Sequence, residues 1–312
     1  MIEVSHVSKR YGGVQALSDI SLQVKKGSVM GLLGQNGAGK TTLLNIITGY
    51  LAATEGQVRM NGHDPLMEPE EAKRCLGYLP EHPPLYDEMT VEEYLSFVSR
   101  LRGVVQGAVP AHVSEIINKT GLAAMRRRLL SHLSKGYRQR AGMAQALCGD
   151  PEVLILDEPT VGLDPKQIME IRSLIQSLAK GRTIIFSSHI LGEVQQLCDH
   201  VVILHQGRVK LDMPMDRLEA GDGVTLRCTV AAEEARALPA LQGLVGAKSV
   251  TLQPAGKKGE TTVLAAFPPA GEPEKAVFAL CSGQGLPIIH LSRCRNTLEQ
   301  VFLQTISDTL SV

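Results

Sequence analysis

Three short apolar segments, each followed at once by polar residues, are the feature that most constrains the fold of this chain. They are Val29–Leu33, Val153–Leu156 and Thr183–Phe186. A strand buried on both faces is continuously apolar, so these segments predict central strands of a parallel sheet. Segments with helical periodicity alternate with the strands through about residue 215. The sequence therefore predicts an α/β fold in which helices cover the sheet.

Other segments predict two additions to this sheet. Ile2–Val7, Ala16–Val24 and Gln57–Asn61 look like half-exposed antiparallel strands, which would form a side sheet. Further along, helical periodicity dominates, with helices expected at Val91–Leu101 and His112–Thr120. We therefore expect a first domain at 1–215 that contains an antiparallel β subdomain and a helical subdomain at about 82–150.

The pattern restarts after Pro214 and predicts a second, smaller domain at 221–312. The expected elements, in order, are a strand at Val224–Val230, a helix, strands at Ala247–Leu252 and Thr261–Phe267, a helix at Pro273–Leu280 and a strand at Pro287–Leu291. This βαββαβ order predicts an α+β domain of ferredoxin-like type. A last helix is expected from Thr297 to about Ile306.

Composition argues against several classes of protein. Lys and Arg (32) balance Asp and Glu (32), so no basic field draws the chain to nucleic acid, and no nucleic-acid partner is expected. No apolar run approaches the roughly 20 residues of a membrane helix, and the N-terminus lacks the pattern of a secretory signal. The six cysteines form no pair with metal-ligand spacing. We expect a cytoplasmic protein.

A glycine-rich segment between an apolar strand and a helix predicts a phosphate-binding loop. Gly34 to Thr41 fits the pattern G-x-x-x-x-G-K-[ST]. Its glycines let the backbone wrap the phosphates, and backbone N–H groups and the helix N-terminus hold the anionic oxygens. Lys40 would reach the β and γ phosphates, and the Thr41 hydroxyl would bind Mg²⁺. The cofactors expected are therefore ATP and Mg²⁺.

Two carboxylates follow the second apolar segment, at the end of a strand where α/β sheets bind ligands. Asp157 would hold Mg²⁺, and Glu158 would orient and polarise the attacking water. An isolated Asp-Glu pair is more often a helix start or a surface turn. The strand before it and the phosphate loop favour the catalytic role.

The segment Leu133-Ser134-Lys135-Gly136-Tyr137 precedes an apolar helix and makes a family resemblance specific. The chain resembles the nucleotide-binding subunits of ABC transporters, whose signature reads LSGGQ followed by a basic residue. Lys135 stands in place of a glycine and Tyr137 in place of the glutamine. Ser134 taken alone would be a helix N-cap. The resemblance implies the P-loop NTPase fold and a signature that contacts the γ-phosphate held by the opposite subunit.

The resemblance also assigns roles to single residues. Tyr11 would stack on adenine, His189 would touch the γ-phosphate, and Glu81 stands where the family has a glutamine, close enough to approach Mg²⁺. The nucleotide-binding residues would be Tyr11, Gly34, Gln35, Asn36, Gly37, Ala38, Gly39, Lys40, Thr41 and Thr42; the catalytic residues Glu158, His189 and Glu81; the Mg²⁺ ligands Thr41, Asp157 and Glu81; and the D-loop Gly162, Leu163 and Asp164.

Within that family the chain is similar to exporter subunits of the ABC-2 type, including gliding-motility-type ATPases. The resemblance implies a homodimer that sandwiches two Mg-ATP molecules and drives a separately encoded permease, on the inner face of the cell membrane. The permease would contact the groove near Pro83 to Tyr86. The alternatives are a soluble ABC ATPase acting on ribosomes or DNA, and a regulatory module without turnover. The first generally has tandem cassettes or a long coiled coil, and the second would not need Glu158 and His189.

Overall fold

The first unit of the chain is built on a six-stranded sheet whose core strands are fully buried. The computed structural model describes residues 1–220, 223–253, 257, 259–268, 271–294, 298–299 and 301–302. Met1–Met215 belong to one compact unit, and a second unit begins at Asp216. The sheet order is β5-β6-β7-β3-β8-β9, and only β9 runs antiparallel to its neighbour. The strands are β3 (Val29–Leu33), β5 (Leu76–Leu79), β6 (Val153–Asp157), β7 (Thr183–Ser188), β8 (His200–His205) and β9 (Arg208–Pro214).

The predicted antiparallel side sheet is present in the order β2-β1-β4. Its strands are β1 (Ile2–Tyr11), β2 (Val14–Val24) and β4 (Glu55–Met60). Apolar residues of helix α1 (Lys40–Ile47), such as Leu43 and Ile47, share one buried core with side chains of both sheets. This core therefore anchors the helix that follows the predicted phosphate loop.

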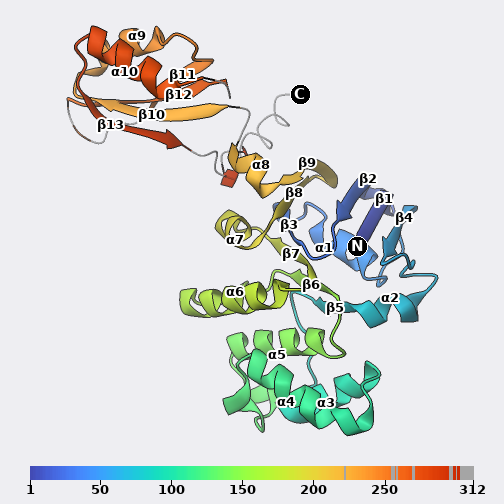
Figure 1. Cartoon of the computed structure of the whole chain (residues 1–312). Helices are drawn as coiled ribbons and strands as arrows, with labels where there is room; N and C mark the ends of the chain where they lie inside the picture. The colour runs from blue at the N-terminus through green and yellow to red at the C-terminus, as the bar shows by residue number, and fades with distance from the viewer. Residues whose placement is uncertain are drawn as a thin grey trace. The chain divides into compact units, whose positions relative to one another are not determined.

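Three helices form a group of their own, coloured green in Figure 1. They are α3 (Val91–Leu101), α4 (Val109–Lys119) and α5 (Lys135–Leu147), and all three contact one another. A capping box between Thr90 and Glu93 starts α3, which has the predicted bounds. The remaining helices of this unit are α2 (Pro69–Cys75), α6 (Pro165–Ala179) and α7 (Leu191–Leu197), and α8 (Met215–Ala220) follows β9.

The second unit has the predicted βαββαβ order and a four-stranded antiparallel sheet with the order β11-β12-β10-β13. Buried side chains of β12, including Val263 and Ala265, pack with Val277 of α10 in one core. The elements are β10 (Val224–Val230), α9 (Glu234–Gln242), β11 (Ser249–Gln253), β12 (Thr261–Phe267), α10 (Pro273–Gly283) and β13 (Ile288–Cys294). Most of the helix expected from Thr297 to about Ile306 lies outside the described residues.

Candidate active site

The site forms where three neighbouring parallel strands end at the same edge of the sheet. The register pairs Leu33 of β3 with Ser188 of β7, and Asp157 of β6 with Ser187 of β7. The next residues along the chain are the phosphate loop, Glu158 and His189. The sheet therefore brings three segments together that lie far apart in the sequence.

Two glycines of the phosphate loop, Gly34 and Gly39, are packed too closely for larger side chains. A Cβ on Gly34 would lie 2.5 Å from the carbonyl oxygen of Leu204. Gly39, the N-cap of α1, has a φ of 105°, which favours glycine. The buried Nζ of Lys40 donates a 2.7 Å hydrogen bond to the carbonyl oxygen of Gly34. Residues of the loop and the first residues of α1 line one pocket, where a helix N-terminus favours an anion.

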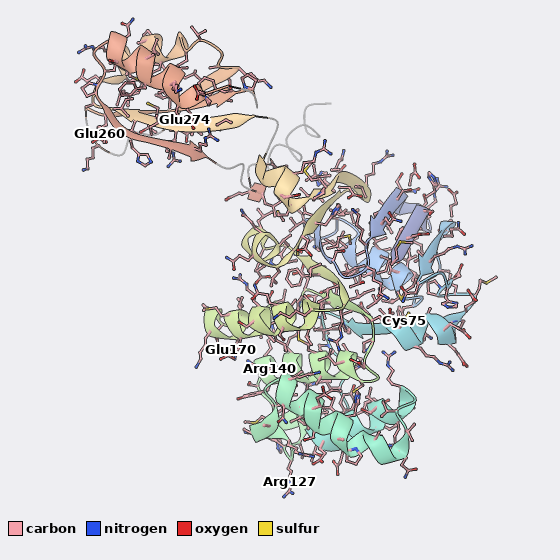
Figure 2. All side chains as sticks on the ribbon, in the orientation of Figure 1. Cys75, Arg127, Arg140, Glu170, Glu260 and Glu274 are labelled. Carbon is pink, nitrogen blue, oxygen red and sulfur yellow. The ribbon has the colours of Figure 1, made fainter. Side chains whose placement is uncertain are left out.

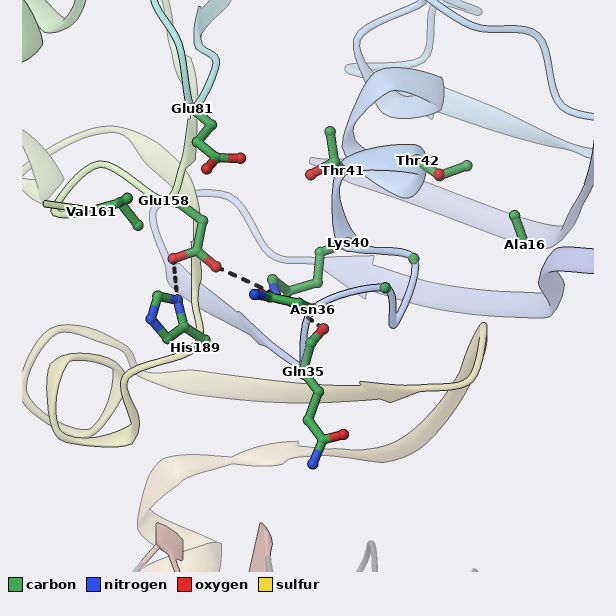
Figure 3. Close-up of a pocket in the computed structure, with 12 residues that line it drawn as sticks. Ala16, Gln35, Asn36, Lys40, Thr41, Thr42, Glu81, Glu158, Val161 and His189 are labelled. Atoms are coloured by element: carbon green, nitrogen blue, oxygen red, sulfur yellow. Dashed lines mark hydrogen bonds and ion pairs between the residues drawn. The ribbon is translucent and has the colours of Figure 1, made fainter.

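Glu158 lies between the loop lysine and His189, as Figure 3 shows. Its Oε1 is 3.3 Å from Nζ of Lys40, and its Oε2 is 2.8 Å from Nδ1 of His189. The side chains of Lys40 and Glu158 are only 7% and 8% exposed, whereas that of His189 is 46% exposed. Charges at this depth are weakly screened, so the group is suited to bind a phosphate and to accept a proton from water.

From the neighbouring strand, the hydroxyl of Ser187 bonds the carboxylate of Asp157 and the backbone of Glu158. Ser187 Oγ donates to Oδ1 of Asp157 at 2.6 Å and accepts from the backbone N–H of Glu158 at 2.9 Å. Glu158 has a φ of 48°, in the left-handed region that side chains seldom adopt. The bond from Ser187 helps to hold this strained backbone, which turns the Glu158 side chain towards His189.

The environment of Asp157 fits a magnesium site. Its side chain is fully buried, and Oδ2 has no hydrogen-bond partner among the described residues. Burial raises the pKa of Asp157, and the negative charges of Glu158 and Glu81 raise it further. The hydroxyls of Ser187 and Thr41 act in the opposite direction and lower this pKa. The Thr41 hydroxyl does so without forming a hydrogen bond of regular geometry to Asp157. A bound cation would repay this cost of burial.

The number of available ligands also fits Mg²⁺. Among the described residues no three His, Cys, Asp or Glu side chains gather as a metal site. Mg²⁺ is usually held by one or two carboxylates together with phosphates and waters. Thr41, Asp157 and Glu81 are the residues that would hold it here, and bound Mg²⁺ would neutralise charge on the phosphates.

Most of the predicted nucleotide-site residues line one pocket of about 440 Å³, drawn in Figure 3. Its lining consists of Ala16, Gln35, Asn36, Gly37, Gly39, Lys40, Thr41, Thr42, Glu81, Glu158, Val161 and His189. Tyr11, predicted to stack on adenine, is outside this lining. Its ring is 48% exposed and lies 5.3 Å from Nζ of Lys9. The sequence did not single out Ala16 or Val161, and nothing in their residue type would have identified them.

The signature residues line a different pocket, of about 610 Å³, between α5 and α6. Gly136 and Tyr137 lie there together with Asp164 of the predicted D-loop. Ser134 is the N-cap of α5, but its side chain makes no capping hydrogen bond. The ammonium of Lys135 occupies the place that a Cβ of Gly162 would take. Signature and D-loop are therefore neighbours in one chain, and neither lines the pocket of the phosphate loop.

An ion pair supports the arrangement of α5 and α6. Arg140 of α5 and Glu170 of α6 pair beside the signature pocket, and Figure 2 labels both side chains. Asp164 caps α6, and its carboxylate accepts from the backbone N–H of Gln167 at 2.9 Å. The D-loop therefore leads into a helix whose start is fixed.

Comparison with known proteins decides the family. Residues 17–161 match the family model described as ABC transporter. The chain is 39% identical over 221 residues to the bacitracin transport ATP-binding protein BcrA of Bacillus licheniformis, covering 70% of this chain and 71% of that protein. It is also 39% identical over 215 residues to the ABC transporter ATP-binding protein NatA of Bacillus subtilis, covering 67% and 87%. The chain belongs to the ABC transporter family.

Solved structures agree with this assignment. An ATP-binding subunit of an ABC transporter is 33% identical, with a TM-score of 0.64 over 69% of this chain and 90% of that one. The cbiO1 protein of Clostridium perfringens is 29% identical, with a TM-score of 0.62 over 69% and 88%. The predicted family and the predicted α/β fold are thus confirmed. The chain is an ATP-binding and ATP-hydrolysing subunit of an ABC transporter.

Proposed function

We propose that this ABC ATPase works as a homodimer in which each active site combines the phosphate loop of one copy with the signature of the other. The observation that carries the proposal is the separation of these residues within one chain. Lys40, Glu158 and His189 surround one pocket, and Gly136 and Tyr137 line another. A second copy would bring the N-terminus of its α5 to the γ-phosphate, where the helix dipole favours negative charge.

In this dimer the residues of one chain have separate tasks. Lys40 and the backbone N–H groups of the loop bind the phosphates, and Asp157 holds Mg²⁺. Glu158 orients the attacking water and takes its proton at a carboxylate oxygen, while His189 holds Glu158 and approaches the γ-phosphate. Phosphoryl transfer asks a protein mainly for positioning and stabilisation of charge, which this set of groups supplies.

The proposed membrane partner is a separately encoded permease of the ABC-2 export type. Among the matching relatives, the lantibiotic transport ATP-binding protein SrtF of Streptococcus pyogenes is 35% identical over 220 residues. By their names SrtF serves lantibiotic transport and BcrA serves bacitracin transport, which supports a transport role with a membrane partner. None of the helices in the described ranges has the length and apolar character needed to cross a membrane.

A second groove offers a place where that permease would act. It has a volume of about 570 Å³ and shares Thr41, Glu81 and Asp157 with the predicted magnesium site. Pro84, which lies beyond Glu81, also lines it, and its carbonyl oxygen accepts from the hydroxyl of Tyr94 at 3.3 Å. A permease segment seated here would act on the hydrolytic centre through Glu81.

Two experiments test the proposal. Glu158→Gln should retain ATP binding, lower turnover by about 10² to 10⁴, the range of general acid–base catalysis, and accumulate an ATP-dependent dimer visible by light scattering. Full ATPase activity in this variant would remove Glu158 as the base, and a monomer at saturating ATP would remove the composite site.

The second experiment identifies the partner. The tagged chain is purified from the membranes of its own host in mild detergent, and the co-purified proteins are identified by mass spectrometry. A polytopic permease at near-equal stoichiometry is expected. Ribosomal or DNA-repair proteins, with nothing recovered from the membrane fraction, would replace the transporter proposal by the soluble alternative.

A further inference from the structure

A buried carboxylate outside the nucleotide pocket joins two segments of the active site. Glu193, on α7, is fully buried. One of its oxygens, Oε2, accepts two hydrogen bonds, from Oγ1 of Thr160 at 2.8 Å and from Oγ of Ser188 at 3.0 Å. Both donors are themselves buried. Because solvent does not reach this carboxylate, the two hydroxyls supply the hydrogen bonds that water would otherwise give to Oε2.

The two donors lie on the segments that carry the paired groups of the active site. Thr160 follows Glu158 by two residues and begins the segment that leads to Gly162. Ser188 directly precedes His189, and its Oγ also accepts from the backbone N–H of Ile190 at 3.0 Å. The Ser188 hydroxyl therefore links the two neighbours of His189, Ser188 and Ile190, and its bond to Glu193 fixes both of them.

The second oxygen of Glu193 faces the helix that follows the D-loop. Its Oε1 lies 3.6 Å from Nη2 of Arg172 on α6. Arg172 in turn donates from Nη1 to the side chain of Gln196 on α7 at 2.8 Å. The ion pair offsets part of the cost of burying the Glu193 charge, but a well-packed apolar residue would fill the same space without that cost. Stability alone therefore does not account for a charge here.

We propose that Glu193 is a positioning residue for ATP hydrolysis. By holding Thr160 and Ser188 on one oxygen, it sets the separation of Glu158 and His189 and ties the D-loop to the segment that carries His189. Glu193 lies outside the lining of the nucleotide pocket. Its loss is expected to change the chemical step and to leave ATP binding intact, because its hydrogen bonds and ion pair among the described residues go to Thr160, Ser188 and Arg172 and not to the phosphate loop.

The first test removes one hydroxyl while keeping volume. Thr160→Val should lower kcat about 10-fold, because small misplacements of reacting groups cost this much or more, with KM for ATP changed less than about 2-fold. Thr160→Ser, which keeps the hydroxyl, should restore kcat to within about 2-fold of the wild type. The matched control is Thr261→Val in the second unit, since Thr261 is equally buried and donates one hydrogen bond of 2.7 Å, to the carbonyl oxygen of Ala232.

Equal kcat values for Thr160→Val and Thr261→Val would overturn the proposal, as would a Ser variant no better than Val. A second pair of variants guards against poor folding at Thr160. Glu193→Gln keeps an acceptor oxygen for both hydroxyls, and Glu193→Leu keeps only the volume. The Gln variant should retain at least about five times the kcat of the Leu variant, with equal affinity for ATP by calorimetry. Equal kcat in the two variants, or a loss of ATP affinity that matches the loss of kcat, would contradict a positioning role.

Discussion

Replacing Asp157 by asparagine should stabilise the nucleotide-free protein while it abolishes Mg²⁺-dependent hydrolysis. Asp157 is fully buried, its Oδ2 has no hydrogen-bond partner among the described residues, and its pKa is raised by burial. An asparagine keeps the oxygen that accepts from Ser187 and removes the negative charge near Glu158 and Glu81. The residue that we propose to hold the metal thus destabilises the protein when no metal is bound.

The magnitude follows from the unpaired oxygen. A buried polar group without a partner costs about 1–3 kcal/mol, and more when it is charged; the amide group of asparagine would also be unpaired but carries no charge, so a gain of about 1–2 kcal/mol is expected. In a unit of this size that gain raises Tm by about 2–8 °C.

The pH dependence has a definite sign. Because the folded-state pKa of Asp157 is raised, the penalty for burying its charge is absent below the pKa of the unfolded aspartate and develops as the pH rises from that value to the folded-state pKa. The advantage of Asp157→Asn should therefore be greatest at pH 8 and vanish at about pH 4, near the pKa of the unfolded aspartate.

The assay is thermal unfolding without nucleotide, followed by calorimetry at several pH values. Asp19→Asn is the control, because Asp19 is 71% exposed and its φ of 54° also suits asparagine. Its Tm should stay within about 1 °C of the wild type, as for most surface substitutions. With Mg-ATP present the order should reverse, since only the wild type gains the full free energy of ligand binding. A lower Tm for Asp157→Asn than for the wild type at pH 8 without nucleotide would refute the reasoning.

Three further predictions concern neighbouring groups. Ser187→Ala removes a donor to Asp157 and should shift the acidic limb of the ATPase pH profile upward by about one unit, since a hydrogen bond to a charged group contributes about 1.5–3 kcal/mol; an unmoved limb would contradict this. Tyr11→Ala should weaken ATP binding by about 1–3 kcal/mol in calorimetry if the ring stacks on adenine, and unchanged affinity would exclude it from the site. Gly142→Ala should lower stability in chemical denaturation by about 1–3 kcal/mol, because its Cβ would lie 2.6 Å from Cγ of Pro83.

The sequence predicted best those helices and strands that a pattern of neighbouring residues specifies. The central strands were found because they are apolar throughout, and α3 because its residues repeat with helical periodicity; in the structure a capping box of Thr90 and Glu93 starts this helix. Helix α4 begins at Val109, three residues before the predicted start, since Pro110 belongs to its first turn instead of ending a loop. Strand β5 was missed because four residues with a central glycine carry no strand signal, and pairing with β6 forms it.

The site was predictable where a motif fixes the backbone and not where tertiary contacts decide. Most of Gly34 to Thr42 and Glu158 line one pocket, and the sequence could propose them for it because polar residues directly follow the ends of apolar strands. The sequence assigned no role to Ser187, although its register with Asp157 gives it two hydrogen bonds at the site. Glu193 was missed altogether, because a glutamate on a short helix looks like a surface residue until packing shows that it is buried.

The nucleotide pocket and the groove beside it have Thr41 and Glu81 in common. If a permease occupies that groove, no substitution of these two residues can adapt the subunit to a new membrane partner without also altering its rate of hydrolysis. Exchange of ATPase subunits between related transporters should therefore succeed only when the groove and the magnesium residues are transferred as one block, and hybrids that divide them should bind their permease yet hydrolyse ATP without transporting anything.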